Sequence, residues 1–332
     1  MISHTLDNAL FGLFSTHALH LADKHGVFAH LIEEGPADPV GISVSRQIDA
    51  ETLERLLLVL AAVSVVERDD EGLYRLAPEL VPALDRRSPR YLGSFVRHLV
   101  TNTTGQLHQL DAYLTQGKAA VDAELPAPFD TIYKDEAATE AFLEAMWQLS
   151  FGVSGELVRL AELDGVRTLV DVGGASGAFA VAALRSYPEL NVTVFDLPQV
   201  GPFLERTREA EGSGDRLGFV PGDFFADALP RAECLSFGYI LSDWDDETCV
   251  ELLTKAYDAC ANGGRVLLME RLFDEAGGPL ATAAMNLSMH VETQGRHRTA
   301  SEYTELLEKS GFVDCSVHRS TWDKHLVVGR KP

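Results

Sequence analysis

Apolar residues recur every three or four positions through the first half of the chain, which predicts helices there. From Thr168 onward, short β-branched runs alternate with helical patterns instead. That alternation predicts a mostly parallel sheet with crossover helices, an α/β fold. The expected strands are 167–172, 191–195, 217–220, 234–241, 265–270, 313–319 and 325–329. The last two are separated only by Ser320–Lys324, so we expect them to form a terminal antiparallel hairpin.

A different order of elements is predicted near the N-terminus. Ser43 or Ser45 is a candidate start for one helix, and Asp49 is placed to cap the next. A short hairpin follows, turning at Asp70-Glu71-Gly72. Helix, turn, helix and hairpin together predict a winged helix, a fold that commonly binds DNA.

Charge argues against DNA binding by this region. The second helix carries Glu51 and Glu54, and the hairpin carries Glu67, Asp69 and Asp70, so neither surface suits a phosphate backbone. We therefore expect the winged helix to make a subunit contact. A DNA-binding regulator remains the alternative from a different functional class.

Composition narrows the class of protein further. The 332 residues include 28 basic and 50 acidic side chains, a formal net charge of −22, and 46% are hydrophobic. Such acidity disfavours nucleic acid and anionic membranes as partners. The N-terminus lacks a signal-peptide pattern, and Leu56–Val66 is too short to span a bilayer. Four cysteines without metal-binding spacing suit a reducing compartment, so we expect a cytoplasmic protein without a metal site.

The strongest local signal is a glycine loop after the first strand of the predicted sheet. In TLVDVGGASGAFAVAAL, Asp171 precedes Gly173, Gly174 and Gly177, and a helix follows. Glycines there permit a tight turn and let a ligand approach the backbone. Asp196 ends the next strand, where a carboxylate can accept both hydroxyls of a ribose.

A second acid changes the expected ligand. Asp223, after the third strand, can accept from an adenine amino group, with Phe224 packing beside the ring. The loop reads D-x-G-G-x-x-G, unlike the dinucleotide pattern G-x-G-x-x-G. Ribose and adenine recognition without strong pyrophosphate binding describes S-adenosylmethionine. Neighbouring residues assigned to the same cofactor site are Leu197, Gly222, Ser242 and Trp244.

Residues 101–165 read as connecting helices that carry a bulky apolar stripe. Phe142, Met146, Trp147 and Phe151 form either core packing or the wall of an aromatic substrate pocket, and periodicity does not separate the two. The segment 125–135 reads as a proline-bearing loop that enters this helix. We assign to substrate binding Phe142, Met146, Trp147, Tyr239, Met289 and Arg296.

An ordered set of motifs resembles one enzyme family. DVGGASG, VFDLP, GDFF, LSDWDDETC, GGRVLLMERL and QGRHRTASEYTELLEKSGF resemble the small-molecule O-methyltransferases, in particular acetylserotonin and bacterial natural-product enzymes. The resemblance implies a Rossmann-like domain, S-adenosylmethionine as cofactor and a small-molecule acceptor. It also implies a homodimer joined through the N-terminal domain. The expected divisions are a dimerisation domain over 1–100, a lid over 101–165 and a cofactor domain over 166–332.

The chain departs from that family where its general base is expected. The family has a His where this chain has Ser242, and an acid where it has His297. A serine hydroxyl is no base at neutral pH without an activator. The family acid Glu270 is retained.

Three explanations of this departure fit the sequence. The first makes His297 or His290 the base, oriented by Glu270 or Asp243; flanking arginines would keep His297 neutral or would bind a substrate carboxylate. The second is base-free transfer to a nitrogen, driven by proximity. The third is methylation of an aromatic carbon. A non-methylating enzyme that retains the cofactor is a further alternative.

Overall fold

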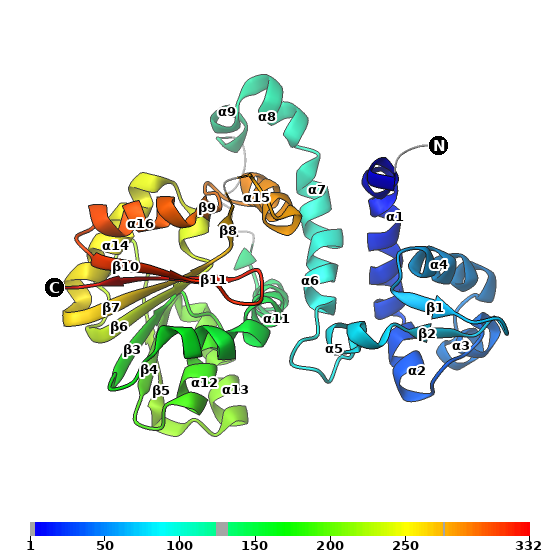
Figure 1. Cartoon of the computed structure of the whole chain (residues 1–332), viewed down its shortest axis with the longest axis horizontal. Coiled ribbons are helices and arrows are strands. Elements are labelled where there is room, and N and C mark those ends of the chain that lie inside the picture. Colours follow the sequence, from blue (N-terminus) through cyan, green and yellow to red (C-terminus); the bar gives the residue numbers. More distant parts are fainter. Residues whose placement is uncertain (1–3, 124–131, 275) are drawn as a thin grey trace. The chain divides into compact units, whose positions relative to one another are not determined.

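The computed structural model describes residues 4–123, 132–274 and 276–332 (Figure 1). The predicted loop at 125–135 lies largely outside the described residues. The chain divides into two compact units, Met1–Gly105 and Gln106–Pro332. No helix among the described residues is long and apolar enough to cross a membrane.

The first unit is mainly helical and carries one short antiparallel hairpin. Its elements are α1 (His4–Lys24), α2 (Val27–Glu33), α3 (Pro39–Arg46), α4 (Ala50–Ala62), β1 (Val66–Arg68), β2 (Tyr74–Leu76), α5 (Val81–Leu84), α6 (Gly93–His98) and a π-helical turn (Leu99–Thr103). In the hairpin Val66 pairs with Leu76, which places two buried apolar side chains opposite each other.

Capping residues explain where the two helices before this hairpin begin. The Asp49 carboxylate accepts a hydrogen bond from the Thr52 amide at 2.8 Å, so α4 begins as the sequence predicts. The preceding helix begins earlier than expected, because the Asp38 carboxylate accepts from the Gly41 amide at 2.8 Å and Pro39 favours the first helical position. Ser43 and Ser45 therefore lie inside α3.

The second unit is built on a seven-stranded sheet in the order β10-β11-β7-β6-β3-β4-β5. The strands are β3 (Thr168–Val172), β4 (Asn191–Asp196), β5 (Leu217–Pro221), β6 (Ala232–Gly238), β7 (Cys260–Glu270), β10 (Val313–His318) and β11 (His325–Arg330). Strand β11 is antiparallel to both β10 and β7, whereas the other pairs are parallel. The predicted α/β class and the terminal antiparallel hairpin are confirmed.

Helices cover both faces of this sheet. On one face lie α11 (Glu136–Ala161), α12 (Ala178–Ser186) and α13 (Gly201–Glu211), and on the other lie α14 (Asp246–Ala259) and α16 (Ala300–Lys309). The chain also forms α7 (Thr104–Leu107), α8 (Leu110–Gln116), α9 (Lys118–Asp122), α15 (Leu280–Glu292) and a small parallel pair, β8 (Leu272–Phe273) and β9 (Arg298–Thr299). Leu169 packs with α11 and α12, while its neighbour Val170 packs with α14 and α16. The period of two along each strand thus creates two apolar layers.

Strand register determines where a ligand site can form. Val172 at the end of β3 lies beside Phe195 of β4 and Phe237 of β6. The carboxyl ends of the three strands, and the loops that leave them, therefore meet at one edge of the sheet. In open α/β sheets, ligands bind at this edge.

Candidate active site

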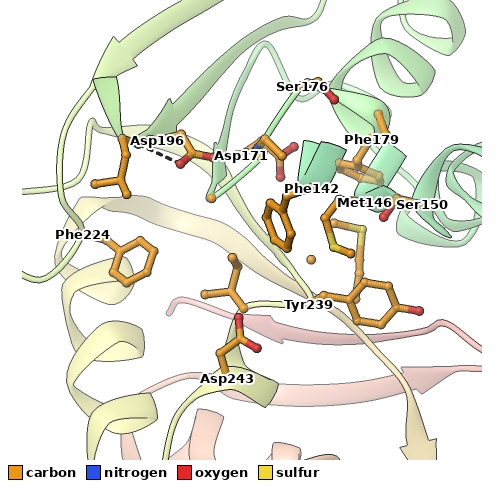
Figure 2. Close-up of a pocket in the computed structure, with 18 of the residues that line it drawn as sticks. Phe142, Met146, Ser150, Asp171, Ser176, Phe179, Asp196, Phe224, Tyr239 and Asp243 are labelled. Carbon is orange, nitrogen blue, oxygen red and sulfur yellow. Dashed lines mark hydrogen bonds between the residues drawn. The ribbon is translucent and has the colours of Figure 1, made fainter. Parts of the chain in front are cut away.

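A cavity of about 250 Å³ opens at this edge of the sheet, within the second unit. Figure 2 shows residues from β3, β4 and α11, and Tyr239 just after β6, around it. Many of the predicted site residues line it: Phe142, Met146, Trp147, Asp171, Gly173, Gly174, Asp196, Leu197, Gly222, Asp223, Phe224, Tyr239, Asp243 and Trp244.

The glycine loop shapes one wall of the cavity. Gly173 has a φ of +65°, and a Cβ atom there would lie 2.3 Å from Cδ1 of Ile240. A Cβ on Gly174 would lie 2.6 Å from a carboxylate oxygen of Asp171. A larger residue at either position would therefore require the side chain of Ile240 or of Asp171 to move. Both side chains line the cavity, so the two glycines help to set its shape.

Asp196 joins this loop to the end of β4. One of its carboxylate oxygens accepts from the amide of Ala175 at 2.8 Å, and the other accepts from the amide of Leu197 at 2.7 Å. Burial raises the pKa of Asp196 to about 6, and these two hydrogen bonds oppose the rise. The carboxylate is held in place by the backbone while still lining the cavity, as hydroxyl recognition requires.

The loop after β5 supplies a second acid and an aromatic ring. Asp223 accepts a hydrogen bond from the amide of Phe225 at 2.8 Å, which fixes the turn that carries Phe224. The rings of Phe224 and Trp244 meet edge to face, with centroids 6.3 Å apart. Both rings line the cavity, so a flat heterocycle would find an apolar surface beside a carboxylate.

Helix α11 forms the opposite wall. Asp135 caps this helix by accepting from the amide of Ala138 at 2.8 Å. Phe142, Met146 and Ser150 recur every four residues, so they project from one helical face into the cavity (Figure 2). Phe151 lies outside the cavity lining and stacks on Trp147, with centroids 4.6 Å apart. The predicted stripe therefore serves both the cavity and the core.

Acidic groups gather inside the cavity. Burial raises the pKa of Asp171 to about 6, although the Ser236 hydroxyl donates to its carboxylate at 2.6 Å. Burial also raises the pKa of Asp243 well above its ordinary value, and nearby Glu270 and Glu292 raise it further. A bound cation would relieve this repulsion and stabilise the charged carboxylates.

The remaining predicted residues are not brought into the lining of this cavity. Gly177 is the N-cap of α12, and Ser242 is 1% exposed. Glu270 is fully buried, and its Oε1 atom accepts from the amide of Leu241 at 3.1 Å. On α15, Met289 lies outside the lining, and exposed His290 packs edge to face against Tyr113.

His297 is also placed away from this cavity. It is 3% exposed, and its amide donates to the Asn286 side chain of α15 at 2.7 Å. Neither ring nitrogen has a hydrogen-bond partner within the described part of the chain. The pKa of His297 is lowered to about 4, mainly by burial, then by Arg271 and Arg298. Neutrality was expected, but its main cause is burial rather than the two flanking arginines.

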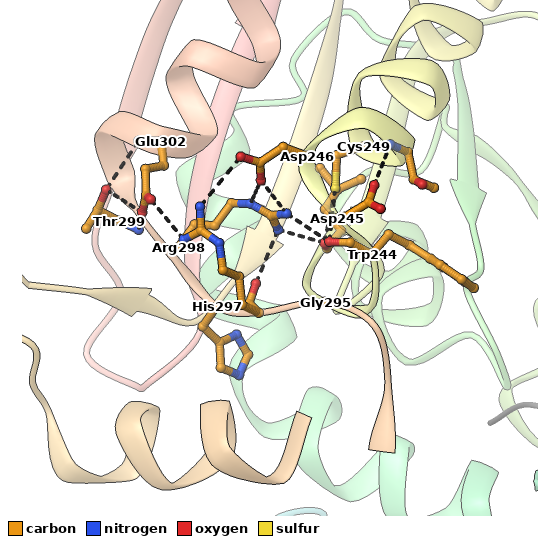
Figure 3. Close-up of polar contacts among 12 residues, drawn as sticks. Trp244, Asp245, Asp246, Cys249, Gly295, His297, Arg298, Thr299 and Glu302 are labelled. Atoms are coloured by element: carbon orange, nitrogen blue, oxygen red, sulfur yellow. Dashed lines mark hydrogen bonds and ion pairs between the residues drawn. The ribbon is translucent and has the colours of Figure 1, made fainter. Parts of the chain in front are cut away.

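The basic cluster around His297 is structural in this fold (Figure 3). Arg298 is completely buried, and its guanidinium donates to the backbone oxygens of Leu241 and Trp244 at 2.9 and 2.8 Å. It also pairs with Asp246 at 2.7 Å. Arg296 is exposed and pairs with Glu302 at 2.8 Å. The expectation that these arginines bind a substrate carboxylate is not supported, because local partners already occupy both.

Sequence reasoning missed several residues that line the cavity. They are Tyr133, Ser150, Ala175, Ser176, Ala178, Phe179, Phe225, Gly238, Ile240, Met269 and Lys324. Most adjoin predicted residues along the chain, so proximity to the glycine loop or the aromatic stripe could have found them. Lys324 has no such signal, because it is the final residue of the last predicted loop, Ser320–Lys324. No group of three or more potential metal ligands occurs among the described residues.

The sequence of this chain is similar to those of known methyltransferases. An O-methyltransferase domain model matches residues 108–313. The chain belongs to the O-methyltransferase family. It is 33% identical to 3-hydroxy-5-methyl-1-naphthoate 3-O-methyltransferase from Streptomyces sahachiroi, over 90% of this chain and 86% of that protein. It is also 32% identical to the tetracenomycin polyketide synthesis 8-O-methyl transferase TcmO from Streptomyces glaucescens, over 82% and 80%.

A solved structure agrees with this assignment. Human N-acetylserotonin methyltransferase in complex with S-adenosylmethionine superposes with a TM-score of 0.89 at 29% identity, covering 98% of this chain and 96% of that chain. This O-methyltransferase family member is therefore an S-adenosylmethionine-dependent enzyme. The predicted family, fold, cofactor and enzyme class are confirmed.

Proposed function

We propose that the chain transfers the methyl group of S-adenosylmethionine to a hydroxyl oxygen on a small aromatic metabolite. The observation that carries the proposal is the cavity itself, in which the glycine loop and Asp196 face the aromatic wall of α11. The two Streptomyces relatives, named for methylating a naphthoate and a polyketide, support an aromatic acceptor from natural-product synthesis.

The residues around the cavity fit the cofactor in shape and charge. Asp196 would accept the ribose hydroxyls, Asp223 and Phe224 would hold the adenine, and Gly173 would admit the methionine end. A Cβ at Gly173 would displace the side chain of Ile240, which lines the cavity. When bound, S-adenosylmethionine supplies a methyl group on a positively charged sulfur, and the acceptor oxygen displaces the neutral thioether. The buried acids favour such a positive charge over a neutral ligand.

Asp243 is our candidate for the group that removes the acceptor proton. It lines the cavity, whereas Ser242, His290 and His297 do not. A carboxylate with a raised pKa is a stronger base, closer to the pKa of about 10 of a phenol. As the new bond to carbon forms, the acceptor hydroxyl would release its proton to the carboxylate of Asp243. Bulk water would then remove that proton.

We also propose that the first unit mediates homodimerisation. Helix α1 exposes a cluster of large apolar side chains near its start: Leu6, Leu10, Phe11, Leu13 and Phe14, each between 48% and 61% exposed. Clusters of this kind mark interaction surfaces. A second copy of this helix would bury them, and the acidic composition of the chain favours that occupant over DNA.

A methylation screen tests the proposed function. The enzyme would be incubated with methyl-labelled S-adenosylmethionine and matched acceptors that differ in one group: 2-naphthol, 2-naphthylamine and naphthalene. We expect label to be transferred to the oxygen of the naphthol, identified by mass spectrometry. Transfer to nitrogen or ring carbon alone would contradict the proposal and would support the base-free or carbon-methylating alternative.

A further inference from the structure

A buried lysine lines the cavity at the end of the terminal hairpin. Lys324 closes the loop between β10 and β11 and is 4% exposed. Its Nζ atom donates to the Ser150 hydroxyl at 3.2 Å and lies 3.9 Å from the centroid of the Tyr239 ring. Among the described residues that line the cavity, Lys324 is the one basic side chain.

The ammonium group of this lysine has few hydrogen-bond acceptors around it. An ammonium group offers three N–H donors, and the Ser150 hydroxyl is the one acceptor bonded to it in the described part of the chain. Asp171 and Glu270 raise its pKa electrostatically without a hydrogen bond to it. Burial lowers the pKa more strongly, because water no longer stabilises the charge. Because no carboxylate is hydrogen-bonded to the ammonium in the described part of the chain, N–H donors remain for an anionic ligand.

The position of Lys324 relates it to the glycine loop. A Cβ atom on Gly238 would lie 3.2 Å from its Nζ atom, so a side chain there would crowd the ammonium. Gly238 directly follows Phe237, which pairs with Val172, the residue before Gly173. The ammonium thus lies at the carboxyl edge of the sheet, beside the start of the loop. The backbone of Tyr239, held at a φ of +58°, completes this corner.

The acids that suit a sulfonium would repel any anionic part of a ligand. Asp171, Asp196 and Asp243 all line the cavity. A carboxylate that enters this space therefore needs a cation, and Lys324 is placed to supply it. We propose that Lys324 is the anion-binding group of the cavity and that it receives a ligand carboxylate. The proposal rests on the proposed function, since it takes the cavity to be the methyl-transfer site.

Two ligands can supply that carboxylate, namely the methionine end of the cofactor or an acidic aromatic acceptor. The first is tested by calorimetric titration with S-adenosylhomocysteine and with 5′-methylthioadenosine, which lacks the amino-acid part. If the cofactor is the source, Lys324→Met weakens S-adenosylhomocysteine binding about ten- to hundredfold, the range of a charge-assisted hydrogen bond. Binding of 5′-methylthioadenosine then stays unchanged. Lys309→Met, on the exposed end of α16, is the matched control.

The acceptor source is tested on enzyme saturated with S-adenosylhomocysteine. The probes are 3-hydroxy-2-naphthoate and 2-naphthol, which differ by the carboxylate. If the acceptor is the source, Lys324→Met weakens naphthoate binding at least tenfold and leaves naphthol binding and S-adenosylhomocysteine affinity unchanged. Either pattern supports the proposal and identifies the source.

Two outcomes overturn it. In the first, wild type and Lys324→Met bind S-adenosylhomocysteine equally well and also do not differ in their binding of 3-hydroxy-2-naphthoate. Failure of both proteins to bind the naphthoate counts as no difference. The second is equal loss of S-adenosylhomocysteine and 5′-methylthioadenosine, which indicates a structural role. Lys324→Gln repeats the test with a polar side chain should the Met variant fail to fold. Failure of wild type itself to bind S-adenosylhomocysteine would instead contradict the proposed function.

Discussion

Substitutions at Arg298 and Arg296 test whether burial determines how much each arginine contributes to the stability of the second unit. They are two residues apart, yet Arg298 is completely buried and the side chain of Arg296 is 44% exposed. Replacing each with Met removes a similar charge from very different surroundings. We expect Arg298→Met to destabilise the second unit strongly and Arg296→Met to have little effect.

The magnitude follows from the contacts that each substitution removes. Arg298→Met takes guanidinium donors from two backbone oxygens, those of Leu241 and Trp244, and each buried acceptor left without a strong donor costs about 1–3 kcal/mol. The ion pair with half-exposed Asp246 adds about 0–1 kcal/mol. We therefore expect a loss of about 2–7 kcal/mol. Arg296→Met removes exposed ion pairs and should cost less than about 1 kcal/mol.

Tryptophan fluorescence during thermal denaturation measures this difference directly. All three tryptophans, Trp147, Trp244 and Trp322, lie in the second unit, so the signal reports its unfolding. In a unit of this size, each kcal/mol moves the melting temperature by about 2–4 °C, so Arg298→Met should melt about 4–28 °C lower. Melting temperatures for the two variants within about 2 °C of each other would refute the structural role of Arg298.

Three further predictions address the cavity and the assembly. Asp243→Asn should lower kcat at least tenfold and should remove the rise in rate with pH. The carboxylate acts as a base only when it is ionised, and burial raises its pKa above the ordinary range. An unchanged pH–rate profile would indicate base-free transfer or another base. Gly173→Ala should abolish S-adenosylhomocysteine binding in calorimetry. The control Gly212→Ala should leave binding intact, because Gly212 has a similar φ of +60° but no atom within 4 Å of the added Cβ. Similar binding by both variants would contradict a steric role for Gly173. Phe14→Glu should convert a dimer to a monomer in sedimentation velocity, and an unchanged sedimentation coefficient would place the interface elsewhere.

Local pattern predicted the sheet and the cofactor loop well, because both depend on short-range rules. The period of two in each strand sets which residues are buried, and parallel strands bring their carboxyl ends to one edge. Asp196 and Asp223 follow adjacent strands, so spacing alone brings their side chains to the same cavity.

The burial of Arg296, His297 and Arg298 could not be predicted from the sequence, because tertiary contacts determine which of these side chains are buried. Arg298 pairs with Leu272 in the short β8–β9 ladder, which directs its side chain inward, while Arg296 stays near the surface beside α16. From the sequence, Arg296 and Arg298 are expected either to keep His297 neutral or to bind a substrate carboxylate. The burial of His297 follows from its contact with Asn286 on a different helix, which spacing does not reveal.

Lys324 was missed for a related reason. Its position in the cavity depends on strand β11 pairing with β7, where His325 lies opposite Glu270. That pairing is antiparallel and joins residues far apart in the chain. A lysine at the end of a loop is ordinarily exposed, so its residue type also argued against a buried site.

We propose that Asp196 binds the ribose of S-adenosylmethionine in this cavity. Calorimetric titration of S-adenosylhomocysteine into wild type, Asp196→Ala and the exposed control Asp215→Ala tests this role. Loss of the carboxylate removes acceptors for ribose hydroxyls and releases the amides of Ala175 and Leu197. Wild type and the control should bind alike, and Asp196→Ala should bind at least about a hundredfold more weakly. Equal affinity in all three proteins would show that Asp196 does not hold the cofactor.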